Sequence, residues 1–136
     1  MSDEFPTLTL EEFKTAIKEV SQFELENKKE QQKHFIFKLI ETNNELLQEI
    51  DKLKNDESEE AKSDLKLYQE TILENKHSLL EQIARVESIN DELIRRHLIS
   101  EQVKKQDEEK LLNDINEKDV PGTKKETNDK KEGVYL

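Results

Sequence analysis

The sequence predicts an all-α protein in which a short N-terminal helix is followed by an antiparallel two-helix coiled-coil hairpin and a disordered C-terminal tail. Glycine and proline, the residues that interrupt helices and form turns, are nearly absent: the 136 residues contain two of each, and residues 7–120 contain neither. Sheet and βαβ folds need such turn residues every ten or so positions. The composition, 32% hydrophobic and 40% charged, is also too polar for a thick layered core. Finally, apolar residues recur at alternating spacings of three and four, which is a heptad pattern.

The first helix is predicted over residues 9–20, after a disordered N-terminus of residues 1–8. Thr9 followed by Glu12 is the sequence signature of a capping box, in which hydroxyl and carboxylate each accept a backbone N–H. One apolar stripe follows, formed by Leu10, Phe13, Ile17 and Val20. We therefore expect a short amphipathic helix.

The second helix is predicted over residues 22–54. Ser21 followed by Glu24 repeats the capping pattern and places a helix boundary where no glycine or proline requires one. The stripe that follows is a heptad seam, made by Ile36, Leu39, Asn43, Leu46, Ile50 and Leu53.

A charged loop separates this helix from a third one, predicted over residues 60–113. Its apolar positions recur every seven residues, at Leu65, Ile72, Leu79, Val86 and Leu93. Apolar residues then nearly vanish, so residues 114–136 are expected to form a disordered tail of mixed acidic and basic residues.

The register of the hairpin follows from a short loop centred near Glu59. Antiparallel helices joined there would place opposite one another residues whose numbers sum to about 118. Asn43 then faces Asn75, and a buried amide is tolerated when it finds a hydrogen-bonding partner. We interpret the two asparagines as a register lock; the alternative is that both are partly solvated and contribute little.

The N-terminal part of the second helix is polar, whereas the part of the third helix that would face it is an apolar strip. A partner-binding surface is therefore predicted, formed by Val86, Ile89, Leu93, Ile94 and Leu98 together with Phe13, Ile17 and Val20 of the first helix. The first helix, a dimer partner or a client protein could cover the strip. Proximity favours the first helix, although one short helix is too small to cover all of it.

Enzymatic and cofactor chemistry have no signature in the sequence. There is no glycine-rich phosphate loop and no cysteine, and the spacing of His34, His77 and His97 does not suit a metal site. We thus expect neither an enzyme nor a cofactor or metal. The net charge of −11 argues against nucleic-acid binding. Uncharged runs are too short to span a membrane, and the acidic N-terminus lacks a signal segment, so a cytoplasmic or nuclear location is expected.

The chain ends in Val134, Tyr135 and Leu136. This ending resembles the hydrophobic-tyrosine-any terminus with which proteasome activators and some regulatory ATPase subunits enter pockets of the 20S α-ring. A chance match, or another use of the tail, is the alternative.

Several segments together resemble the fungal translation-machinery-associated protein family, over roughly residues 10–95. They are Glu11-Glu12-Phe13-Lys14-Thr15-Ala16-Ile17, the Ser21 cap, Glu24-Leu25, Asn43-Asn44-Glu45-Leu46, Asp64-Leu65-Lys66-Leu67-Tyr68 and Glu74-Asn75. The resemblance implies a non-catalytic chaperone of proteasome assembly, which binds a regulatory-particle ATPase subunit and promotes its pairing with a neighbour. It also implies an association with ribosomes.

Heptads with acidic faces are equally typical of a structural coiled-coil subunit in a permanent cytoskeletal, kinetochore or tethering complex. That hypothesis stays open beside the chaperone. The identity of the ATPase subunit and the oligomeric state, monomer or dimer, also stay open.

Overall fold

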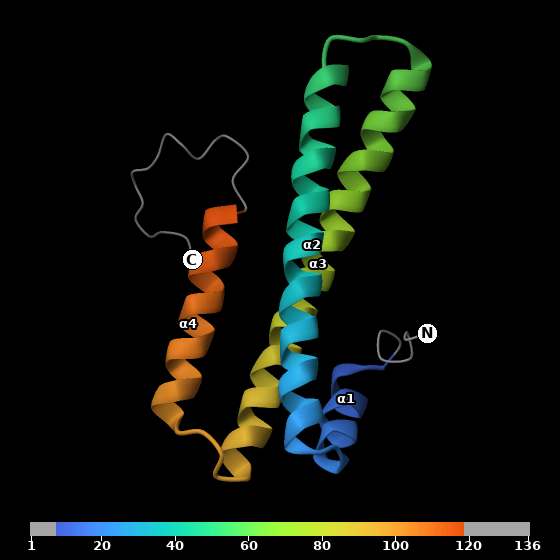
Figure 1. Cartoon of the computed structure of the whole chain (residues 1–136). Helices are drawn as coiled ribbons and strands as arrows, with labels where there is room; N and C mark the ends of the chain where they lie inside the picture. The colour runs from blue at the N-terminus through green and yellow to red at the C-terminus, as the bar shows by residue number, and fades with distance from the viewer. Residues whose placement is uncertain (1–7, 119–136) are drawn as a thin grey trace.

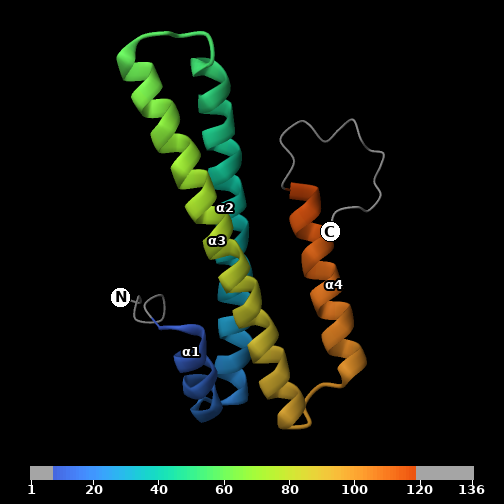
Figure 2. The same ribbon diagram turned by 180° about the vertical axis from the view of Figure 1, so that it is seen from behind.

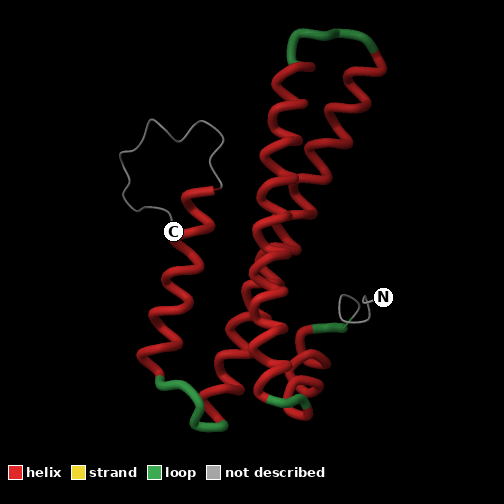
Figure 3. The backbone as a smooth tube through the Cα atoms, viewed as in Figure 1, coloured by secondary structure: helices red, strands yellow, loops and turns green. Residues whose placement is uncertain are grey.

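A computed structural model describes residues 8–118 and confirms that this part of the chain is all-helical. The elements are α1 (Leu10–Ala16), the 3-10 turn η2 (Ile17–Glu19), α2 (Gln22–Leu53), α3 (Glu59–Arg95) and α4 (Glu101–Lys118). Figure 3 shows these helices joined by short loops, with no strand anywhere in the described range.

The long helices α2 and α3 run antiparallel and form the centre of the molecule (Figure 1). Their register is the predicted one. The Asn75 Nδ2 donates to Asn43 Oδ1 at 2.9 Å, and Asn43 Nδ2 donates to the carbonyl oxygen of Ile72 at 3.4 Å. The two core asparagines therefore face and bond one another across the seam.

Local caps explain where three of the helices begin. At Thr9 both arms of the capping box are present: the Glu12 N–H donates to the Thr9 hydroxyl, and the Thr9 N–H donates to the Glu12 carboxylate. Ser21 accepts from the Glu24 N–H at 3.1 Å, and Ser58 caps α3 in the same way. The predicted starts of the first two helices are thus confirmed.

The predicted third helix, residues 60–113, was wrong in its length. α3 ends at Arg95 because His97 adopts a left-handed conformation, with φ of 63°. The Leu98 N–H bonds to the Leu93 carbonyl at 2.9 Å and the His97 N–H to that of Ile94 at 2.8 Å, the two bonds of a Schellman motif. A histidine therefore ends the helix at a position where glycine is the usual residue.

The chain then reverses and continues as α4. Ser100 accepts from the Val103 N–H at 3.1 Å, which supplies the N-terminal cap of the new helix. α4 extends to Lys118, so residues 114–118 of the predicted tail are helical, because Leu111 and Ile115 bury their side chains against the hairpin. The rest of that predicted tail lies outside the described residues.

α1 and α4 lie on opposite sides of the α2–α3 pair, as Figure 1 and the reverse view in Figure 2 both show. Each covers one buried apolar cluster. The first consists of Phe13, Ile17, Leu25, Ile89 and Leu93; the second of Ile36, Ile40, Val86, Leu111 and Ile115. The lower half of the hairpin thus carries a helix on each of two sides.

Candidate partner-binding surface

The surface predicted to receive a partner is largely covered by the chain itself. Phe13, Ile89 and Leu93 are at most 1% exposed and pack together in the first cluster, with Val20 and Ile99 at its margin. The short N-terminal helix therefore folds back over the strip, the arrangement that proximity favoured. The expectation of an open client surface at these residues is corrected accordingly.

Polar contacts fasten α1 and η2 to α3. The Arg85 guanidinium donates to the carbonyl oxygen of Leu8 and lies 5.5 Å from the centroid of the Phe13 ring. Arg96 donates to the carbonyls of Ile17 and Lys18, both at 3.2 Å. Arg96 thereby satisfies carbonyls at the C-terminal end of the short helical segment, where helices leave such groups unpaired, and Arg85 holds the residue that precedes its N-terminal cap.

Glu92 holds the two arginines at the end of α3. Its carboxylate accepts from Arg95 at 2.6 Å and from Arg96 at 2.7 Å, and the residue is 5% exposed. The hydrogen bond from Arg95 lowers the pKa of Glu92 to about 2, supported by Arg96 and opposed by burial. Arg96 is thereby oriented toward η2 and is part of the internal packing, whereas the Arg95 side chain stays 61% exposed.

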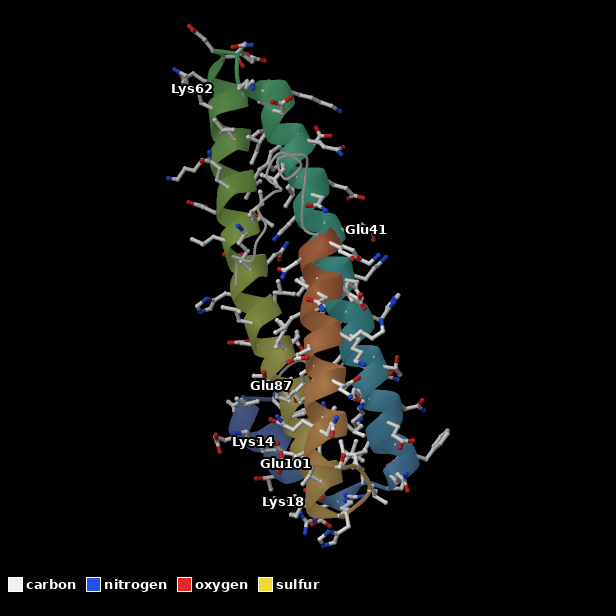
Figure 4. The ribbon with its side chains drawn as sticks, turned by 90° about the vertical axis from the view of Figure 1, so that its left-hand side faces the viewer. Lys14, Lys18, Glu41, Lys62, Glu87 and Glu101 are labelled. Atoms are coloured by element: carbon white, nitrogen blue, oxygen red, sulfur yellow. The ribbon has the colours of Figure 1, made fainter. Side chains whose placement is uncertain are left out.

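The second cluster lies under α4. Figure 4 shows α4 lying over the seam between α2 and α3. Of the 18 residues of α4, Leu111 and Ile115 are buried. Full burial of two such side chains contributes about 3–6 kcal/mol before ordering costs. The apolar part of this contact is therefore small for so long a helix.

An ionic network accompanies the apolar contact. Asp107 accepts from Lys33 at 2.8 Å and lies 3.4 Å from the ammonium of Lys29. Asn90, which is fully buried, accepts from Lys29 at 2.9 Å and donates to Asp107 at 3.1 Å and Glu108 at 3.2 Å. We call the surface of α2 and α3 beneath α4 the groove. Its polar half is formed by Lys29 and Lys33 of α2 and by the amide of Asn90 of α3.

Charges in this network alter the ionisation of its acids. Burial opposes ionisation of Asp107, but Lys33, Asn90 and Lys29 together hold its pKa below the usual value. Burial and the neighbouring carboxylate of Glu108 raise the pKa of Glu87. Asp107 is therefore held as a carboxylate, whereas Glu87 is protonated more easily than an exposed glutamate.

Two open grooves follow the edge where α4 meets α2. One, of about 400 Å³, is lined by residues including Lys33, Phe37 and Leu111. The other, of about 460 Å³, is lined by Phe37, Ile40 and Asn44 among others, and the Asn44 Oδ1 is buried with no hydrogen-bond partner. The seam between α4 and α2 is therefore incompletely filled.

The other predicted residues are spread more widely. Ile94 is half-buried and Leu98 is 41% exposed, while Val134, Tyr135 and Leu136 lie outside the described residues. Additional large apolar side chains are exposed on the hairpin, namely Phe23, Phe35, Leu47, Leu67, Leu73 and Leu80. The strip predicted as one surface is thus divided between two internal clusters and a small exposed remainder.

No group of three or more His, Asp or Glu side chains in residues 8–118 is arranged to hold a metal ion. Within the same range, no helix is both long and apolar enough to cross a membrane.

Sequence reasoning missed the groove under α4, although three signals for it are present. Ser100 is a capping residue, and Leu111 and Ile115 are spaced i, i+4. Lys29 and Lys33 share the same spacing on an otherwise polar part of α2. The polarity of that stretch is explained by its pairing with the carboxylates of α4.

No family model, curated protein or solved structure matches this chain.

Proposed function

We propose that this protein is a non-catalytic assembly chaperone that binds an ATPase subunit of the proteasome regulatory particle and promotes assembly of the base. In this proposal it works by binding alone, and the client contributes a helical or coiled-coil segment. The proposal starts from the resemblance to the translation-machinery-associated family, which implies this client and an association with ribosomes.

One structural observation supports a helix-binding role. The hairpin of α2 and α3 already receives a helix on each of two sides, through small apolar clusters flanked by charged side chains. Amphipathic helices recognise grooves of this kind by apolar residues three and four positions apart. We therefore propose that α2 and α3 act as an antiparallel coiled-coil scaffold whose natural ligands are helices.

The test is a pull-down in which the full-length protein is the bait and each purified regulatory-particle ATPase subunit is offered separately. We expect capture of at least one subunit, and circular dichroism must show that the bait is helical. A folded bait that captures none of them refutes the proposal. The same experiment with Tyr135 and Leu136 deleted separates any contribution of the C-terminal motif from that of the helices.

A permanent structural subunit is the second candidate, favoured by the upper part of the hairpin. Leu47, Leu67 and Leu73 are exposed there, at 37%, 56% and 69%. Exposed apolar side chains on a long helical pair suit incorporation into a larger assembly. Sedimentation of cell extract distinguishes the two: a chaperone travels with assembly precursors, whereas a permanent subunit travels with a finished complex.

A further inference from the structure

The groove under α4 recognises three side chains of its present occupant, one on each of three successive turns. They are Asp107, Leu111 and Ile115, spaced four residues apart. Asp107 meets the two lysines and Asn90, whereas Leu111 and Ile115 enter the apolar cluster with Ile36, Ile40 and Val86. The groove is therefore polar at one end and apolar at the other.

The direction of the bound helix is fixed by two contacts far apart along it. Lys33 bonds to Asp107, and Asn44 donates to the Lys118 carbonyl at 2.9 Å, so both pairs have the same separation of 74 positions. Two helices keep a constant offset only when they run in parallel. A helix in this groove runs parallel to α2, with its acidic residue toward the N-terminal end of α2.

The receiving side chains would keep their chemistry if α4 left. Asn90 is fully buried and donates to two carboxylates that both belong to α4. If α4 left, water would reach this amide and the two lysines, and a partner helix that covered them again would have to supply acceptors, because buried donors without partners are costly. The incompletely filled seam with α2 also leaves room for larger side chains than those of α4.

We propose that this groove is the binding site for a helix of a partner protein, and that α4 is its intramolecular occupant and competitor. The partner helix carries an acidic residue followed by apolar residues at i+4 and i+8, and it lies parallel to α2. Its acid takes the place of Asp107 against Lys29 and Lys33. The inference rests on the proposed function for the identity of the client and adds the chemistry by which the client helix is recognised.

The test uses the full-length chain and, as a probe, a synthetic peptide of residues 100–118. Because the chain has no cysteine, Gln31→Cys and Glu109→Cys introduce a unique pair of sites for nitroxide labels on α2 and α4. Peptide binding, followed by fluorescence anisotropy, should be accompanied by a longer distance between the two labels. Peptide binding without any change in that distance would place the peptide elsewhere and overturn the proposal.

Competition by the tethered α4 is removed by Leu111→Asp, which places a charge in the apolar cluster. A tethered segment acts at an effective concentration of about millimolar, so this chain should bind the free peptide at least about tenfold more tightly than the wild type. Glu109→Asp is the control, since this position is exposed on α4 and should leave the affinity unchanged. A helical Leu111→Asp chain that fails to bind the peptide, or that pairs into dimers instead, overturns the proposal.

Recognition of the acid is tested by exchanging charges. A peptide with Asp107→Lys should bind the wild-type chain about tenfold more weakly or worse, because charged hydrogen bonds are lost. The chain with Lys29→Glu and Lys33→Glu should instead prefer the Asp107→Lys peptide. An unchanged preference would show that the lysines do not recognise the acid.

The outcomes for the groove and for the proposed function are separable. If the peptide behaves as expected but no ATPase subunit is captured, the proposed function fails and the groove assignment stands. If wild-type and Lys29→Glu/Lys33→Glu baits capture a subunit equally, the groove assignment fails and the function stands.

Discussion

Replacing Asn43 by leucine should destabilise the helical pair, although leucine is the commoner residue in such seams. Asn43 is 6% exposed and accepts from Asn75 at 2.9 Å, so its loss leaves the Asn75 amide without its partner beside hydrocarbon. An unsatisfied buried donor costs about 1–3 kcal/mol. We expect Asn43→Leu to lower the free energy of unfolding by about 1–2 kcal/mol, since Asn75 is only half-buried.

Asn75→Leu should have a comparable effect, because Asn43 then keeps only its longer bond to the Ile72 carbonyl. With both asparagines replaced, two leucines meet between layers that are already apolar, and no donor is left unpaired. The double variant should therefore be close to the wild type or more stable. The coupling energy between the two sites should therefore be at least about 2 kcal/mol, since each single variant costs at least about 1 kcal/mol and the double variant costs nothing.

Urea denaturation followed by circular dichroism measures all three variants. Asn27→Leu is the matched control, because Asn27 is exposed on the same helix and its replacement should change stability by less than about 0.5 kcal/mol. If the two single effects simply add in the double variant, the asparagines are not coupled and the register-lock interpretation is refuted.

Three further predictions concern the docking of α1, the end of α3 and the ionisation of Glu92. Phe13→Ala should cost about 3–5 kcal/mol because its side chain is fully buried, whereas Phe23→Ala, at a position 73% exposed, should cost under about 0.5 kcal/mol in the same denaturation assay; similar costs would contradict the docking of α1. His97→Gly should raise the thermal midpoint, gaining up to about 1 kcal/mol by relieving the left-handed conformation, while His97→Val should lower it; a destabilised glycine variant would refute this reason for the helix end. The pKa of Glu92 is lowered to about 2, below its unfolded value of about 4.3, so its contribution is present above about pH 4 and is lost as the pH falls toward 2. The stability difference between wild type and Glu92→Gln should therefore shrink over that interval, and a constant difference would contradict the assignment.

Much of the fold could be predicted because it is encoded locally. Thr9 and Ser21 cap their helices through the residues three positions later, and these bonds are present. The heptad seams and the single facing pair of asparagines likewise determine the register. These features depend on residues that are close in the sequence or on one regular period, so they can be predicted from the sequence alone.

The end of α3 could not be predicted from breaker residues. His97 takes the left-handed conformation without being glycine, and only the surrounding carbonyl bonds reveal it. α4 was missed for a different reason, since Leu111 and Ile115 form too short a stripe to stand out in a polar segment. Its position depends on ion pairs with residues 74 positions away, which no local pattern encodes.

The structure brings together only part of the predicted partner-binding surface, because its contacts join residues that are far apart in the sequence. Phe13 and Ile17 do share a surface with Ile89 and Leu93, but as an internal core and not as an open site. Val86 belongs to the second cluster, which only the return of α4 completes.

Native-state hydrogen exchange of the full-length chain is the most direct test of the central claim that α4 docks reversibly on a stable α2–α3 scaffold. Helices with few buried contacts open independently of the core, at free energies below that of global unfolding. We predict that the amides around Leu111 and Ile115 exchange through such local opening, while those around Ile36 and Val86 require global unfolding. If amides of α4 and of the scaffold share one opening free energy at all denaturant concentrations, α4 is an inseparable part of the core and the claim is contradicted.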